Sequence, residues 1–169
     1  MTGRSPEIIV ALDVERAEEA RRLAGELVSA VDFFKVGSRL FTAEGPSMVR
    51  DLRKAGARIF LDLKFHDIPA TVAGSVRAAT ALGVQMMTLH TWGGVDMMRA
   101  AAEEAAGAAT AAGLERPMLV GVTVLTSLSR ADLEGLMPPD AEIPDLALRL
   151  AGNAKEAGLD GVVASVLEA

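Results

Sequence analysis

The sequence of 169 residues contains no cysteine, so disulfides, zinc–thiolate centres and iron–sulfur clusters are excluded. It also lacks an excess of basic residues, because 17 Lys and Arg stand against 23 Asp and Glu. Without a basic stripe to grip phosphates, nucleic-acid binding is not expected. The sequence has no signal-peptide pattern and no apolar run of membrane-spanning length, so we expect no membrane association and a cytoplasmic location.

The sequence does have the composition of a folded domain. Half of it, 50%, is hydrophobic and 24% is charged, which is typical of a globular chain and not of a disordered one. Its length suits one domain with a sizeable core. We therefore treat residues 1–169 as a single domain.

Apolar runs alternate with amphipathic helical patterns along the whole chain. Predicted strands cover 8–12, 33–37, 58–64, 85–90, 118–124 and 161–165. Predicted helices cover 15–30, 44–55, 69–82, 95–112 and 145–157, with a short helix near 129 and a loop at 138–140. Such alternation indicates parallel strands joined by right-handed crossovers. The pattern alone fits both an open doubly wound sheet and a closed eight-unit barrel.

The first apolar run, 8–12, has no polar interruption, which predicts a strand buried on both faces. Polar residues recur where the predicted strands end, and in both architectures ligands bind at that end. These residues are Asp13, Lys35, Asp62, Lys64, His90 and Thr126.

The stretch from Asp62 to Pro69 is the most informative in the sequence. Strand alternation places Asp62 and Lys64 on the same side, and burying such charges costs several kcal/mol per ion unless they are paired. An isolated Asp-x-Lys at a strand end is often only a solvated pair. Here the motif continues through Asp67 into Pro69, which favours a functional site. His66 is more simply interpreted as orienting the turn.

Two kinds of bound group are not indicated. There is no Gly-x-Gly-x-x-Gly after the first strand and no Walker loop, so a nucleotide cofactor is not expected. The two histidines lie on different predicted elements and no spaced His/Asp set appears, so no metal site is expected.

Four segments together resemble the orotidine 5'-phosphate decarboxylase family of pyrimidine biosynthesis. They are Val10-Ala11-Leu12-Asp13, Phe34-Lys35-Val36-Gly37, Asp62 to Pro69 with Thr71, and Val124-Leu125-Thr126-Ser127. They follow the family's order and spacing. The Phe-His-Asp-Ile-Pro extension is the specific part, since Asp-x-Lys-x-x-Asp is shared with related sugar-phosphate decarboxylases and synthases.

The resemblance implies a TIM-type (β/α) barrel and a carboxy-lyase that converts orotidine 5'-phosphate to uridine 5'-phosphate without a cofactor. It implies a homodimer with shared active sites. Lys64 would stabilise and protonate the C6 carbanion, within a charge network of Lys35, Asp62, Lys64 and the partner subunit's Asp67. The substrate-binding residues it implies are Asp13, Lys35, Thr71, Thr126 and Ser127.

The chain departs from the family pattern in length. A (β/α)₈ barrel typically needs about 250 residues. The sequence predicts six of the eight units. We therefore expect the C-terminal part of the barrel to be missing, together with the family's phosphate-binding loops. Two alternatives therefore stay open. One is a related sugar-phosphate decarboxylase or synthase that uses magnesium, and the other is an inactive truncated barrel that retains only a dimer surface.

Overall fold

The computed structural model of the chain describes residues 7–137 and 142–165. The loop predicted at 138–140 lies outside the described residues. None of the described helices is long and apolar enough to cross a membrane.

The described strands form one parallel sheet in the order β1-β2-β3-β4-β5-β6. Their bounds are Val10–Ala11 (β1), Phe33–Gly37 (β2), Arg58–Phe65 (β3), Met86–His90 (β4), Met118–Val122 (β5) and Gly161–Val163 (β6). A doubly wound sheet reverses its strand order at a switch point, whereas a barrel adds each strand beside the previous one. The sequential order therefore decides between the two architectures that the sequence left open, in favour of the barrel type.

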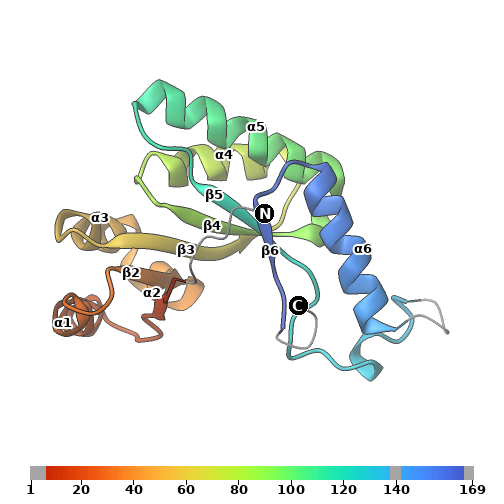
Figure 1. Cartoon of the computed structure of the whole chain (residues 1–169), viewed down its shortest axis with the longest axis horizontal. Coiled ribbons are helices and arrows are strands. Elements are labelled where there is room, and N and C mark those ends of the chain that lie inside the picture. Colours follow the sequence, from red (N-terminus) through yellow and green to blue (C-terminus); the bar gives the residue numbers. More distant parts are fainter. Residues whose placement is uncertain (1–6, 138–141, 166–169) are drawn as a thin grey trace.

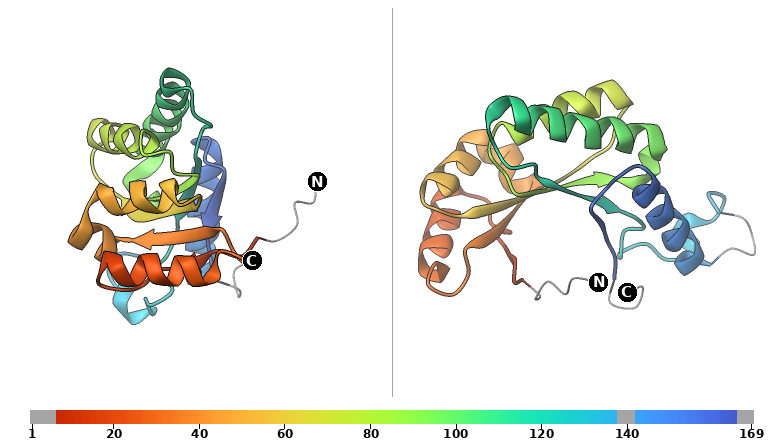
Figure 2. Two further views of the ribbon diagram at one scale, coloured as in Figure 1. Left: turned by 90° about the vertical axis from the view of Figure 1, so that its left-hand side faces the viewer. Right: turned by 45° about the horizontal axis from the view of Figure 1, so that its top comes forward.

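The sheet is curled into part of a barrel, with the helices along its outer side (Figures 1 and 2). The helices are α1 (Ala17–Leu27), α2 (Ser38–Glu44), α3 (Pro46–Lys54), α4 (Pro69–Thr80), α5 (Gly94–Ala112) and α6 (Ile143–Glu156). There are also two 3₁₀ turns: η1 (Thr91–Gly93) follows β4, and η2 (Ala131–Leu133) precedes α6. The predicted fold class, a TIM-type barrel with six β/α units in this chain, is confirmed.

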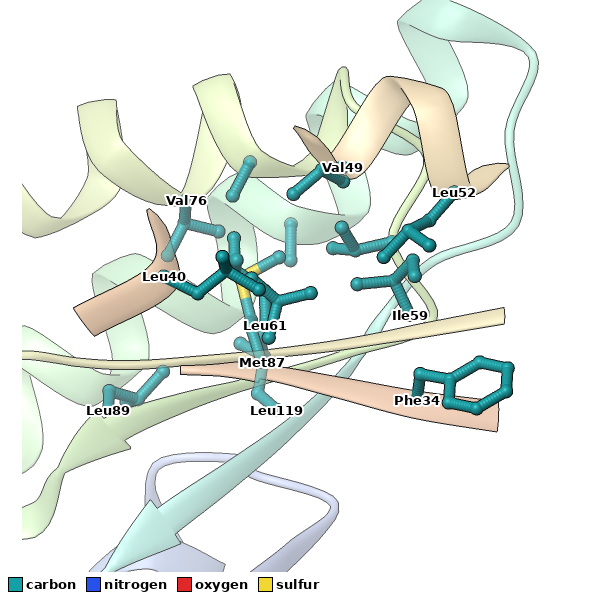
Figure 3. Close-up of a cluster of buried hydrophobic side chains, with 14 of the residues drawn as sticks. Phe34, Leu40, Val49, Leu52, Ile59, Leu61, Val76, Met87, Leu89 and Leu119 are labelled. Atoms are coloured by element: carbon teal, nitrogen blue, oxygen red, sulfur yellow. The ribbon is translucent and has the colours of Figure 1, made fainter. Parts of the chain in front are cut away.

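The main core lies between the sheet and the outer helices. Alternate residues of the strands, such as Ile59 and Leu61 of β3, point toward side chains of α3 and α4, as Figure 3 shows. Both side chains are fully buried. Truncating such a residue to alanine typically costs about 2–5 kcal/mol. Side chains alternate between the two faces of a strand. Because Ile59 and Leu61 face the helices, Phe60 and Asp62 face the inner side of the curled sheet.

The helix predicted over 44–55 is present as α3, but sequence reasoning missed the helix before it. Helix α2 precedes α3, and Gly45, at φ 68°, separates the two. Left-handed φ values favour glycine, and Pro46 then fits the first turn of α3. Helix α2 escaped prediction because its seven residues bury only Leu40 fully, which is too little for a periodic pattern.

The prediction that residues 8–12 are buried on both faces was also wrong. Strand β1 covers only Val10–Ala11, and Ile8 is 71% exposed. The reason is that β1 is an edge of the described sheet and pairs only with β2. At the opposite edge Val162 and Val163 of β6 are each 38% exposed.

Candidate active site

Strand β3 carries a bulge at the point where its charged residues lie. Leu61 pairs with Met87 of β4, and the next pair joins Phe65 to Leu89. Strand β3 thus uses four residues where β4 uses two, so the register shifts between these pairs. Bulges of this kind bend a strand and re-aim its side chains, and they are common beside active sites.

Lys64 lies inside this bulge with a left-handed backbone, at φ 52°. It is the only non-glycine residue with positive φ among the residues that the structure describes. Such a conformation costs about 1–3 kcal/mol and persists where the surroundings impose it, often at functional sites. The strained backbone thus falls on the residue that sequence reasoning placed at the centre of the chemistry.

Four of the predicted residues meet in one charge network. Nζ of Lys64 donates to both carboxylate oxygens of Asp62, at 2.8 and 2.9 Å. Nζ of Lys35 donates to Oδ1 of Asp13 at 3.0 Å and lies 3.7 Å from Oδ2 of Asp62. Positive and negative groups therefore alternate from Asp13 on the loop after β1 to Lys64 on β3.

The four side chains of the network differ in their exposure to solvent. The side chain of Asp62 is 12% exposed and that of Lys35 is 22% exposed, whereas Lys64 reaches 38% and Asp13 67%. Asp62 is thus the inner member, held between two ammonium groups. Lys64 is tied to it but still open to a molecule approaching from solvent.

A cavity of about 160 Å³ opens beside the network. It is lined by all four residues of the network and by the β2–α2 junction, where Gly37 and Arg39 lie. A Cβ at Gly37 would lie in van der Waals contact with the network, 3.4 Å from Nζ of Lys35 and 3.8 Å from Oδ1 of Asp13. The Arg39 guanidinium donates to the carbonyl of Asp13 and braces that loop.

The other predicted site residues are not joined to the network by any contact within the described residues. Asp67 is exposed, and its Oδ1 accepts the N–H of Ile68 at 2.6 Å. Thr71 is exposed in the first turn of α4. Thr126 and Ser127 are exposed on the loop after β5. Their predicted roles stay predictions.

Three residues near the network were missed by sequence reasoning: Gly37, Arg39 and Thr88. The hydroxyl of Thr88 donates to Asp62 and accepts the N–H of Lys64. A signal for Thr88 was present, because it is a polar residue flanked by apolar ones inside the predicted strand 85–90. Gly37 and Arg39 themselves carried no such signal.

A pair of histidines lies next to Lys64. The rings of His66 and His90 are tilted by 33° with centroids 5.4 Å apart. Burial holds the pKa of His90 below its ordinary value, and the charges of His66 and Lys64 act in the same direction. The Nδ1 atom of His90 is buried without a hydrogen-bond partner among the described residues.

A larger cavity, of about 440 Å³, lies at the other end of the strands, around Phe33, Arg58 and Gln85. Two of its three arginines are engaged in ion pairs, Arg58 with Asp32 and Arg116 with Asp160, and Arg53 donates to the carbonyl of Ala57. In barrels of this type the amino-terminal face serves stability and the carboxyl-terminal face carries the chemistry. The smaller cavity, at the carboxyl ends of the strands, is therefore the candidate active site. No cluster of metal-binding side chains occurs within 7–137 and 142–165.

The fold and the site together define a (β/α)-barrel protein with a charged site at the carboxyl ends of its strands. Residues 6–169 match the family described as "Orotidine 5'-phosphate decarboxylase / HUMPS family", and the chain belongs to it. The orotidine 5'-phosphate decarboxylase of Coxiella burnetii is 48% identical over 170 residues, which span all of this chain and 70% of that protein. That of a Nostoc species is 49% identical over 161 residues, 95% of this chain and 67% of its own length.

Two solved structures have the same fold as this chain. The orotidine 5'-phosphate decarboxylase of Lactobacillus acidophilus matches with a TM-score of 0.85 and 38% identity, covering 97% of this chain and 73% of that one. An uncharacterized conserved protein of Geobacillus kaustophilus matches with a TM-score of 0.88 and 38% identity, covering 95% of this chain and 74% of that one. The predicted family is confirmed.

Proposed function

We propose that this chain carries the decarboxylation site of an orotidine 5'-phosphate decarboxylase, a carboxy-lyase of pyrimidine biosynthesis. The observation that carries the proposal is the Asp13–Lys35–Asp62–Lys64 network, with Lys64 strained into a left-handed backbone beside an open cavity. Relatives that share about half of its residues bear that enzyme's name.

In the proposed reaction the bond between C6 of the pyrimidine and its carboxylate breaks. The electron pair stays on C6 and carbon dioxide leaves. The resulting carbanion has no neighbouring carbonyl to delocalise it, so stabilisation must come from charges held in place by the protein. The Lys64 ammonium lies where this charge develops, and Nζ then gives one proton to C6. Solvent returns the proton to Lys64, and no cofactor takes part.

The other charged residues fix and balance that ammonium. Asp62 accepts from Nζ of Lys64 through both oxygens, which limits the directions in which the ammonium can point. Lys35 offsets the charge of Asp62 and, with Asp13, is proposed to bind the ribose hydroxyls. Preorganised charges of this kind need not reorient during the reaction, which is the main advantage of such a site over water.

We further propose that the site is completed by a second copy of the chain. Asp67 and the neighbouring Ile68 are exposed, Ile68 to 66%, on the connection from β3 to α4. In the proposed homodimer, the partner's Asp67 extends the charge network and the partner's Thr71 contacts the ribose. Thr126 and Ser127 of the loop after β5 are proposed to contact the pyrimidine.

Turnover of orotidine 5'-phosphate by the full-length protein, followed as the loss of substrate absorbance, tests the proposal directly. We expect turnover to persist after dialysis against EDTA. Turnover of a sugar phosphate instead of orotidine 5'-phosphate, abolished by EDTA and restored by magnesium, would favour the sugar-phosphate alternative. A protein that neither turns over nor binds a pyrimidine nucleotide would contradict the proposal and favour a barrel that retains only a dimer surface.

A further inference from the structure

The bulge in β3 leaves the N–H of Lys64 without a strand partner. Between the pairs Leu61–Met87 and Phe65–Leu89, β3 has more peptide groups than β4 can match. A buried N–H without an acceptor costs free energy comparable to a lost hydrogen bond. The acceptor in this structure is a side chain, because the N–H of Lys64 donates to Oγ1 of Thr88 at 2.8 Å.

The same hydroxyl also holds the side chain that Lys64 contacts. Oγ1 of Thr88 donates to Oδ1 of Asp62 at 2.9 Å. That oxygen in turn accepts from Nζ of Lys64 at 2.8 Å. The backbone of Lys64, the hydroxyl of Thr88 and the carboxylate of Asp62 thus form a closed ring of hydrogen bonds that returns to the ammonium of Lys64.

Only a group that donates and accepts at the same time closes this ring, and a hydroxyl does both. Thr88 is 1% exposed, so water does not readily replace it. Its neighbours Met87 and Leu89 are fully buried against the helices, so Thr88 points to the opposite, inner side of β4.

We propose that Thr88 is a positioning residue for the reaction, acting through Lys64 and Asp62. Its hydroxyl holds the backbone of Lys64 in the left-handed conformation and fixes the position of Oδ1 of Asp62. Together these contacts direct Nζ of Lys64 toward the reacting carbon. This inference rests on the proposed function for its effect on turnover. Its effect on the Lys64 backbone is independent of that function.

The chain offers a matched control. Thr80 of α4 is also 1% exposed, but its hydroxyl has no hydrogen-bond partner among the described residues. Replacing either threonine by valine keeps the shape of the side chain and removes the hydroxyl. Only Thr88→Val breaks the ring around Lys64, so only that variant should alter the site.

The experiment compares wild type, Thr88→Val, Thr88→Ser and Thr80→Val in the full-length protein. The first measurement is hydrogen exchange of the Lys64 amide by ¹H–¹⁵N NMR. We expect protection in wild type, exchange at least ~10-fold faster in Thr88→Val, and recovery in Thr88→Ser. The second measurement is the steady-state kinetics of orotidine 5'-phosphate turnover. We expect kcat to fall roughly 10- to 100-fold in Thr88→Val with a smaller change in KM, and to recover in Thr88→Ser.

Three results would overturn the inference. The first is fast exchange of the Lys64 amide in the wild type, a measurement that requires no variant to fold. The second is unchanged exchange in Thr88→Val, and the third is faster exchange without a loss of kcat beyond that of Thr80→Val. If the wild type itself does not turn over the substrate, the proposed function fails, while the exchange measurement still decides whether Thr88 positions Lys64.

Discussion

Nζ of Lys64 lies 2.8 Å from Oδ1 of Asp62, although the backbone that joins them leaves the regular path of a strand. Two residues apart on a regular strand are separated by about 6.6 Å along its axis. The bulge and the positive φ of Lys64 accompany the close contact between the two side chains. A pair that served stability alone would not require a strained backbone at one of its members.

The strain at Lys64 gives a prediction about stability that runs against the usual rule for strands. Glycine normally weakens a strand relative to alanine. At φ 52° the sign reverses, because glycine adopts left-handed conformations without the penalty from a Cβ. We expect Lys64→Gly to be more stable than Lys64→Ala by roughly 1 kcal/mol. Urea denaturation of the two variants measures the difference, and an advantage for alanine would show that the backbone is not strained there.

Much of this fold could be predicted because its signals are local. Strand β2 and the end of α5 before Gly113 follow from an apolar run and from a glycine stop. The order of the strands could not be predicted, because pairing joins residues far apart in sequence. Helix α2 was missed because a short helix shows little periodicity.

The candidate site likewise has features that the sequence predicts and features that depend on long-range contacts. The grouping of Asp62 with Lys64 followed from strand alternation, and the observed contact agrees with it. The backbone geometry differs from the expected regular strand, because a bulge brings the two side chains together. That bulge depends on Thr88 of the neighbouring strand, a long-range contact that one sequence does not reveal.

A site shared between two subunits predicts complementation between inactive variants. Asp67→Ala and Lys64→Ala should each be inactive as homodimers. In a mixed dimer, one site combines an intact Lys64 with the partner's intact Asp67. After unfolding and refolding of an equal mixture, we expect about a quarter of the wild-type activity, because half of the dimers are mixed and each has one intact site.

A second mixture provides the control. Asp62→Ala and Lys64→Ala both damage the network of the same subunit, so their mixed dimers contain no intact site. Activity recovered in both mixtures, or in neither, would contradict the shared arrangement of Asp67.

The pKa of His90 predicts a stability that depends on pH. Burial, with the charges of His66 and Lys64, holds the pKa of folded His90 below the ordinary 6.5. The unfolded chain then binds a proton more readily as the pH falls below 6.5, so stability is lost from there down toward the lowered pKa. We expect the melting temperature to fall over this range in wild type and to fall less in His90→Gln.

Carboxylates with lowered pKa values provide the internal reference for this measurement. Arg58 lowers the pKa of Asp32 below 3.8, and Arg77 lowers that of Glu104 below 4.5. Their contributions are lost only at more acidic pH and should be equal in both proteins. Equal slopes for wild type and His90→Gln between pH 5.5 and 7 would contradict the assignment to His90.

The edges of the described sheet predict how a polypeptide of residues 1–169 behaves when expressed alone. Strands β1 and β6 are not paired with each other. Ile8, just before β1, is exposed, as are Val162 and Val163 of β6. Unpaired edges with apolar side chains are templates for association. We expect this polypeptide to aggregate or fold incompletely and to lack turnover, as judged by size-exclusion chromatography and calorimetry. A monodisperse, cooperatively melting and active species would contradict this expectation.

The central claim is that Lys64 stabilises the developing carbanion and then protonates it. The most direct test is kcat of Lys64→Ala in the full-length protein, with Lys54→Ala, an exposed lysine at the end of α3, as the control. Because the ammonium acts mainly on charge present in the transition state, we expect kcat to fall by at least ~10³-fold while nucleotide binding is partly retained. Lys54→Ala should behave as wild type. A Lys64→Ala protein that keeps a near-normal kcat would contradict the account.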